Sequence, residues 1–163
     1  MYGHPGLVAE HAAAFKPTQE NIMQTQSNDT PADLAEIFGE VISSYTRTQA
    51  IDDGMLVDVS HMAREAGFSF PVALTRAAWS DCVEWSEADS RRQTYQDESG
   101  RLWDVLWMAS MAARRGGHEI RFQLYRVPRG GRGMRPRLVT LKAICGAGDE
   151  GEPVIKIMLP TED

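Results

Sequence analysis

Three segments near the end of the chain read Arg121-Phe-Gln-Leu-Tyr-Arg-Val127, Arg137-Leu-Val-Thr-Leu-Lys-Ala-Ile-Cys145 and Pro153-Val-Ile-Lys-Ile-Met-Leu159. In each of them the character of the side chains alternates, and a period of two residues is that of a β-strand. A glycine-rich acidic turn, residues 146–153, joins the last two segments. The pattern predicts a three-stranded antiparallel sheet with one face on a core and the other partly in water.

Three helices are expected to cover one face of this sheet. The first, Asp33–Tyr45, has apolar residues at helical spacing and follows a suitable capping residue, Thr30. The second, Arg76–Ala88, follows Thr75, whose hydroxyl suits the N-cap position. The third, Arg101–Arg115, is apolar on nearly all sides, and a helix of this kind is buried on most of them.

The sequence therefore predicts an α+β fold, in which a three-stranded antiparallel C-terminal sheet is covered by three main helices. Met55–Val59 is short, apolar and β-branched, so it is a candidate fourth strand. Phe68–Leu74 is interrupted by Pro71 and is interpreted as an extended link, and Ser90–Gly100 as a polar loop. Trp107 is expected in the core, so that Trp107→Ala would cost about 3–5 kcal/mol.

The composition indicates one folded domain with a polar arm before it. The chain has 163 residues, of which 42% are hydrophobic, and is long enough to bury a core. Residues 1–29 are expected to form a flexible N-terminal arm, and residues 30–163 a single α+β domain. The apolar runs are too short to span a bilayer and no secretory signal is evident, which favours a cytoplasmic protein without membrane contact. Cys82 and Cys145 are expected to be reduced thiols.

Positive charge is concentrated between the first two predicted strands. Arg114–Lys142 contains eight Arg, one Lys and one Glu, a net charge of +8, whereas the whole chain carries −6. Within this window, Pro128–Pro136 is a glycine-rich loop with several arginines. Such a separation of charge indicates an anionic partner, either a phosphate backbone or an acidic protein surface. The alternative is a solvated hairpin loop whose arginines protect a sheet edge from aggregation.

The predicted contact with an anion rests on arginine chemistry. A guanidinium keeps its charge and offers a planar fork of donors that matches phosphate or carboxylate. The predicted contact residues are the arginines of this loop and its flanking strands, together with two that follow the second helix: Arg126, Arg129, Arg132, Arg135, Arg137, Arg91 and Arg92.

The polar segment Ser90–Arg101 is where an active site would be expected, if the chain is an enzyme. It joins two helices that carry all the tryptophans, and Tyr95, Asp97 and Glu98 are its candidate acids and bases. The alternative is a surface turn held by side-chain hydrogen bonds. The histidines are scattered, so neither a metal nor another cofactor is expected. Cys82 with His61 as nucleophile and base has no supporting local motif.

Three further stretches carry a resemblance. They are Asp53-Gly-Met-Leu-Val-Asp-Val-Ser-His-Met-Ala-Arg-Glu-Ala-Gly-Phe68, Arg92-Gln-Thr-Tyr-Gln-Asp-Glu-Ser-Gly-Arg-Leu-Trp-Asp-Val-Leu-Trp107 and Phe122-Gln-Leu-Tyr-Arg-Val-Pro-Arg-Gly-Gly131. The chain from about Asp33 to Asp163 resembles an uncharacterised family of small bacterial proteins carried on plasmids, integrative elements and phage-like mobile elements. The resemblance implies a genetic context but no activity and no catalytic residues.

Two hypotheses for the function follow. The first is a non-enzymatic interaction protein of a mobile genetic element, which binds and blocks a host protein or nucleoprotein complex, such as a defence or nucleic-acid-processing complex. The arginine loop, with local phosphate contacts, or the acidic surface would form the contact. The second is a small enzyme that acts on a nucleotide or modifies a host protein, with its site in Ser90–Arg101.

Overall fold

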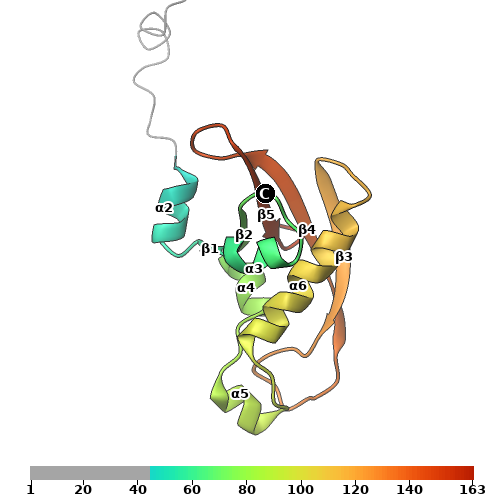
Figure 1. Ribbon diagram of the computed structural model, residues 1–163. Coiled ribbons are helices and arrows are strands. Elements are labelled where there is room, and N and C mark those ends of the chain that lie inside the picture. The colour runs from blue at the N-terminus through green and yellow to red at the C-terminus, as the bar shows by residue number, and fades with distance from the viewer. Residues whose placement is uncertain (1–44) are drawn as a thin grey trace, which may run out of the picture. The chain divides into compact units, whose positions relative to one another are not determined.

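The computed structural model describes residues 45–163, which form one five-stranded sheet with helices packed against it (Figure 1). In chain order, the elements are α2 (Arg47–Asp52), β1 (Leu56–Asp58), α3 (Ser60–Glu65), β2 (Val72–Thr75), α4 (Arg76–Cys82), α5 (Glu87–Arg92), α6 (Glu98–Ala113), β3 (Glu119–Arg126), β4 (Arg137–Ala147) and β5 (Pro153–Met158). The α+β class predicted from the sequence is confirmed.

The strands are ordered β1-β2-β5-β4-β3. The pairs β3–β4 and β4–β5 are antiparallel, which confirms the predicted C-terminal three-stranded unit. The candidate fourth strand is present as β1, which pairs with β2 in antiparallel orientation. The prediction of three strands was incomplete, because β2 joins the two parts by a parallel pairing with β5.

Strand β2 was missed because its sequence has no alternation. Val72, Ala73 and Leu74 are completely buried, as is usual for a strand covered on both faces. Pro71, which suggested a link, immediately precedes the strand, where a missing N–H does no harm. Its carbonyl still accepts a hydrogen bond from the Ile155 N–H at 2.8 Å.

The helix predicted over 76–88 is divided into two. Thr75 caps α4 as expected, with its hydroxyl accepting from the Ala78 N–H at 3.2 Å. Helix α4 ends at Cys82, and a new helix, α5, begins after Ser86. Ser86 and Asp89 form a reciprocal capping box, which satisfies backbone donors that a continuous helix would bind internally.

Helix α6 begins earlier than predicted, at Glu98 instead of Arg101. Asp97 is its N-cap, and its carboxylate accepts from the Gly100 N–H at 2.8 Å. The polar segment predicted as a loop therefore contains the end of α5 and the start of α6. The helix ends at Ala113, two residues before the predicted end at Arg115, and two glycines with φ of 75° and 120°, Gly116 and Gly117, follow.

The third predicted helix is not buried on most sides. Its core face carries Leu102, Val105, Leu106 and Ala109, at the spacing of one helix face. Trp107, expected in the core, is 44% exposed and stacks on Trp103 with ring centroids 6.0 Å apart. Apolar residues continue around the helix, but only one face meets the sheet. The predicted large loss of stability in Trp107→Ala assumed a buried side chain, and this assumption was wrong.

The acidic turn between β4 and β5 holds the short helix α2. The Asp149 carboxylate accepts from the backbone N–H groups of Arg47 and Thr48 at 2.6 and 2.9 Å, and from the Thr48 hydroxyl at 2.7 Å. These hydrogen bonds lower the pKa of Asp149 below its ordinary value. The turn therefore acts as a cap for a helix that lies about a hundred residues earlier in the sequence.

The predicted N-terminal arm, residues 1–29, lies outside the described residues. So does the predicted helix Asp33–Tyr45, except for Tyr45, which precedes α2. Among the helices of residues 45–163, none has the length and hydropathy of a membrane-spanning segment.

Candidate anion-binding site

The two segments that the sequence singled out lie together in the fold. Helix α5 and the loop between β3 and β4 lie at the same end of the molecule, at the bottom of the view (Figure 1). The side-chain amide of Gln93, directly after α5, donates to the carbonyls of Pro128 and Gly133 at 3.0 and 2.6 Å. One glutamine therefore fixes the arginine loop at two points. We call this end of the molecule, residues 84–101 and 126–137, the basic end.

Arg101 anchors the base of the same loop from inside. Its Nε donates to the Val83 carbonyl at 3.0 Å, and its Nη1 donates to the Val127 carbonyl at 3.2 Å and to the Gln96 side chain. The guanidinium lies over the ring of Trp85, with Cζ 4.6 Å from the ring centroid. Burial lowers the pKa of Arg101, although a guanidinium remains charged at neutral pH.

Several of the predicted anion contacts are already paired with carboxylates of the chain. Arg126 binds Asp81 through two nitrogens, at 2.6 and 3.3 Å. Arg129 binds Glu84 at 2.6 Å, and this hydrogen bond lowers the pKa of the Glu84 carboxyl. These contacts connect strand β3 to the end of α4, and the loop to the segment that follows α4.

The two arginines of α5 are paired as well. Arg92 binds Asp89 at 2.8 Å, and Arg91 lies 3.4 Å from Glu87. The pair of Arg91 and Glu87 is exposed on both sides, so it contributes little to stability. Both pairs lie within α5, so among the paired arginines only Arg126 and Arg129 hold β3 and the loop in place.

Arg132, Arg135 and Arg137 differ from the others. All of them are exposed, and within residues 45–163 none forms an ion pair. Arg132 and Arg135 lie on the loop, which Arg101 and Gln93 hold at Val127, Pro128 and Gly133. Arg137 is the first residue of β4. Among the predicted anion contacts, these three are the arginines that have no ion-pair partner within the part of the chain that the structure describes. Their role in binding stays a prediction.

The candidate catalytic residues are adjacent in sequence but make different contacts. Asp97 is the cap of α6, and the Glu98 carboxylate accepts from the Trp85 N–H at 3.2 Å. Tyr95 is 84% exposed. The contacts of both carboxylates are those of a structural turn, which was the alternative interpretation of this segment. A catalytic role for these three residues stays a prediction without a specific contact in its favour.

The cysteines behave as buried or half-buried thiols. Both are free, as predicted, with Cys82 buried and Cys145 half-buried. Burial raises the pKa of Cys82 to about 12, so the thiol is protonated at neutral pH and is a poor nucleophile. His61 is exposed on α3 and lies 3.7 Å from Glu65. In residues 45–163, no group of three or more His, Cys, Asp or Glu could hold a metal ion.

Asp89 is the most strongly perturbed carboxyl of the basic end. It is almost fully buried and accepts from the Ser86 hydroxyl at 2.6 Å, from the Ser86 N–H at 3.0 Å and from Arg92. The hydrogen bonds from Ser86, with the contact to Arg92, lower its pKa from 3.8 to about 2.

Asp89→Asn is expected to remove an acid-sensitive part of the stability. Because the pKa is lower in the folded state, the stabilisation is complete above about pH 4 and is lost as the pH falls toward about 2. In urea denaturation, the unfolding free energies of wild type and variant should differ at pH 7 and converge near about pH 2. Asp104→Asn, which removes an exposed carboxylate of α6, should keep the wild-type profile. Parallel profiles for wild type and Asp89→Asn would contradict the assignment.

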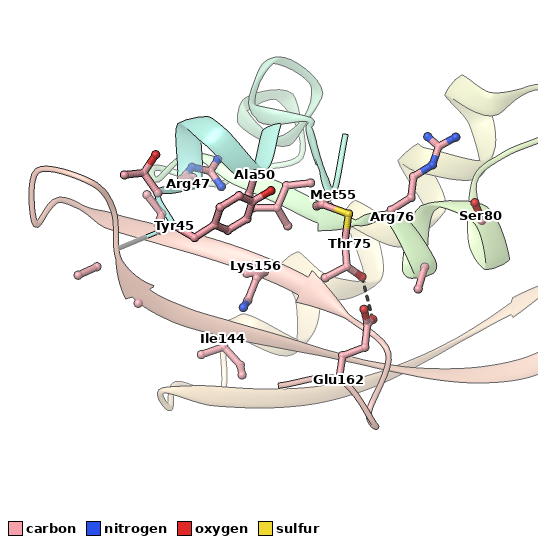
Figure 2. Close-up of a pocket in the computed structure, with 16 residues that line it drawn as sticks. Tyr45, Arg47, Ala50, Met55, Thr75, Arg76, Ser80, Ile144, Lys156 and Glu162 are labelled. Carbon is pink, nitrogen blue, oxygen red and sulfur yellow. Dashed lines mark hydrogen bonds between the residues drawn. The ribbon is translucent and has the colours of Figure 1, made fainter. Parts of the chain in front are cut away.

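Another cavity lies away from the basic end and has a volume of about 820 Å³. Figure 2 shows Tyr45 and Arg47 from the region of α2, and Lys156 and Ile144 from the sheet, around this space. The Thr75 hydroxyl donates to Glu162 at 2.8 Å at its side. No site was predicted here from the sequence, because the lining residues come from separate elements and share no motif.

A second cavity, of about 230 Å³, lies at the basic end. It is lined by Arg101 and Arg126, by the polar side chains of Gln96 and Tyr125, and by Cys82. Only the arginines at 91, 92 and along the loop were expected to meet anions, so Arg101 was missed. Its sequence context, at the start of an apolar helix, suggested only a helix boundary.

The fold and these contacts define a small α+β protein with a basic end built from one loop and two helix termini. The chain belongs to a family described as "Family of unknown function (DUF6573)", whose match covers residues 35–163. This confirms the resemblance to an uncharacterised family. A search of curated proteins and a search of solved structures each find no match.

Proposed function

We propose that this chain is a non-enzymatic interaction protein that contacts phosphate groups of a nucleoprotein complex through Arg132, Arg135 and Arg137. The observation that supports the proposal most strongly is that these guanidinium groups are exposed and, within residues 45–163, have no carboxylate partner. Neighbouring arginines at positions 126 and 129 do have such partners. The chain thus uses some arginines to hold the loop and leaves others available.

The loop geometry favours phosphate as the ligand. Arginine forks match phosphate oxygens, and a loop fixed at its base loses less conformational freedom on binding than a free one. The chain as a whole carries a net charge of −6. Repulsion by the remaining acidic surface would confine a phosphate backbone to the basic end and give the contact one orientation.

The class of partner follows from the resemblance to proteins of mobile elements. Accessory proteins of such elements often protect the element from the host, and host defence or nucleic-acid-processing complexes expose phosphates. We therefore include binding and blocking of such a complex in the proposal. The proposal needs no catalysis, because occupying a surface is sufficient.

The experiment is a fluorescence-anisotropy titration of the full chain against a labelled duplex of about 30 base pairs, at about 50 and 200 mM salt. If three arginines each contact a phosphate, the dissociation constant should rise about 40-fold between these salt concentrations. An unlabelled polyglutamate competitor tests whether carboxylates replace phosphates. No binding at low salt, or stronger binding to polyglutamate than to the duplex, would overturn the proposal of a phosphate contact.

A further inference from the structure

Strand β3 forms one edge of the sheet and offers backbone groups to a further strand. In the order β1-β2-β5-β4-β3 it pairs only with β4, and its eight residues do so in one continuous register without a bulge (Figure 1). The opposite edge, β1, has only three residues. Proteins usually shorten, bulge or cover their edges, and a long, regular edge without proline is a template for strand addition.

The hydrogen bonds to β4 show which backbone groups of β3 are free. The His118 carbonyl accepts from the Cys145 N–H at 3.0 Å, and these two residues extend the antiparallel register by one pair. In such a ladder, opposed residues that bond to each other alternate with opposed residues that do not. Every second residue after His118 therefore bonds to β4. The N–H and C=O groups of the others point away from it: Glu119, Arg121, Gln123 and Tyr125.

A cavity of about 480 Å³ lies between α6 and β3. Its lining includes Met108, Met111 and Arg115 of α6 and the segment after it, and Arg121 of β3. No carboxylate lines it among the described residues, so its charged lining residues are both arginines. Arg115 forms no ion pair within residues 45–163, and Arg121 has only an exposed contact of 3.3 Å with Glu119 of the same strand. The cavity therefore offers apolar surface and positive charge.

The lining of this cavity reaches both faces of β3. Phe122 belongs to the core that α6 covers, whereas the Gln123 side chain donates to the Thr140 hydroxyl at 3.1 Å on the opposite face. All three residues line the cavity. Contact with both faces of an edge strand is expected of a groove that runs along its free edge.

We propose that the edge of β3 binds an extended acidic segment of a protein partner, which adds a sixth strand to the five-stranded sheet. The backbone of this segment forms hydrogen bonds with the outward-facing groups of β3, and its apolar side chains pack on the methionines of α6. An Asp or Glu of the segment lies near Arg115 and Arg121. A second copy of this chain is a poorer occupant, because it brings two edges that carry these arginines together.

Gln123→Pro is the sharpest test, because it removes one outward-facing N–H. Proline is tolerated in an edge strand where its nitrogen faces solvent, so the hydrogen bonds to β4 should remain. Gln123→Ala is the matched control. Both variants lose the side-chain hydrogen bond to Thr140, but alanine keeps the N–H.

The probe is a fluorescein-labelled peptide of alternating valine and glutamate with the length of β3, eight residues, titrated with the full chain by anisotropy. A valine–lysine peptide of equal length is the comparison. Wild type and Gln123→Ala should bind the acidic peptide more tightly than the basic one, and the dissociation constant for the acidic peptide should rise about tenfold or more in Gln123→Pro. No binding at protein concentrations up to about 1 mM, equal binding of the two peptides, or equal affinities of the two variants would overturn the proposal.

A charge reversal keeps the test valid if Gln123→Pro does not fold. Arg115→Glu should weaken binding of the acidic peptide about tenfold or more, because it places a like charge in the cavity. Arg64→Glu, the same change at an exposed position of α3 that does not line the cavity, should have a much smaller effect. Equal effects of the two reversals would show that only net charge matters.

Hydrogen exchange gives evidence that does not depend on any variant. In the free chain, the amides of Glu119, Arg121, Gln123 and Tyr125 should exchange faster than those of the residues between them, and the acidic peptide should slow them. Protection of these amides in the free chain would contradict the proposal. Protection that grows with protein concentration alone would show that a second copy occupies the edge.

This edge is separate from the loop arginines and does not depend on the proposed contact with phosphates. Replacing Arg132, Arg135 and Arg137 should leave peptide binding unchanged, and Gln123→Pro should leave duplex binding unchanged. An unlabelled duplex should not displace the peptide, and displacement would show that the edge binds nucleic acid instead. Failure of this site is therefore distinguishable from failure of the proposed function.

Discussion

Replacing Leu106 by alanine is expected to lower the free energy of unfolding by about 2–5 kcal/mol, because the cavity left in a close-packed core is only partly refilled. Leu106 is completely buried on the face of α6 that meets the sheet. Trp107, the next residue, is 44% exposed and points away from this contact. Trp107→Ala should cost only about 0.5–1.5 kcal/mol, chiefly through its stacking on Trp103.

Urea denaturation of both variants measures this difference. The pair is well matched, since the two positions share one helix and one replacement residue. If Trp107→Ala lowers the free energy of unfolding as much as Leu106→Ala or more, then α6 does not pack against the sheet through the face that carries Leu106. From residue size alone, the larger loss of stability would be expected for Trp107→Ala, whereas burial predicts it for Leu106→Ala.

The second large effect is expected at the loop. Changing Arg132, Arg135 and Arg137 together to alanine should weaken duplex binding about 100-fold near physiological salt, if each loses one phosphate contact. The thermal midpoint should hardly change, because exposed charges without ion pairs contribute little to folding. Both quantities are measured on the same preparations, by anisotropy and by thermal unfolding.

The matched control removes as many exposed arginines outside the loop: Arg64, Arg76 and Arg115. It changes the net charge equally, so it should lower the affinity much less if position matters.

Arg126→Ala is expected to behave in the opposite way to the loop variant. It leaves Asp81 without its two-pronged partner, so its main effect should be on stability.

The C-terminal sheet was predictable because its strands have one core face and one wetter face. The alternating burial in β3 shows this directly, with Phe122 and Leu124 buried between exposed neighbours. Strand β2 has no such signal, since it is covered on both faces and consists of only four residues. A short apolar run after a proline is compatible with a link or a strand, and only its pairing partners decide.

The sequence does contain a pattern that indicates the division of the predicted second helix. Ser86-Glu87-Ala88-Asp89 matches the pattern of a capping box, which marks the start of a helix. The apolar residues on both sides of the break have helical spacing, and this continuity favoured one long helix. The earlier start of α6 has the same kind of cause, because Asp97 is a suitable capping residue that precedes the predicted start at Arg101.

The charge of the candidate site was predictable from the sequence, but the contacts between its residues were not. The arginine loop stands out by composition alone. Its partners do not, because Asp81 lies 45 residues from Arg126 in the sequence, and Gln93 lies 40 residues from the carbonyl it binds. No local pattern relates such positions. The burial of Arg101 likewise depends on elements that meet only in the fold.

The central claim is that the unpaired loop arginines contact phosphates, and the salt dependence of duplex binding tests it most directly. The slope of log affinity against log salt should be steeper in wild type than in the Arg132, Arg135 and Arg137 triple variant, by about 0.9 for each lost contact. For three lost phosphate contacts, the two slopes should differ by about 2.7. Equal slopes and equal affinities would contradict it, and the loop would then be a solvated hairpin.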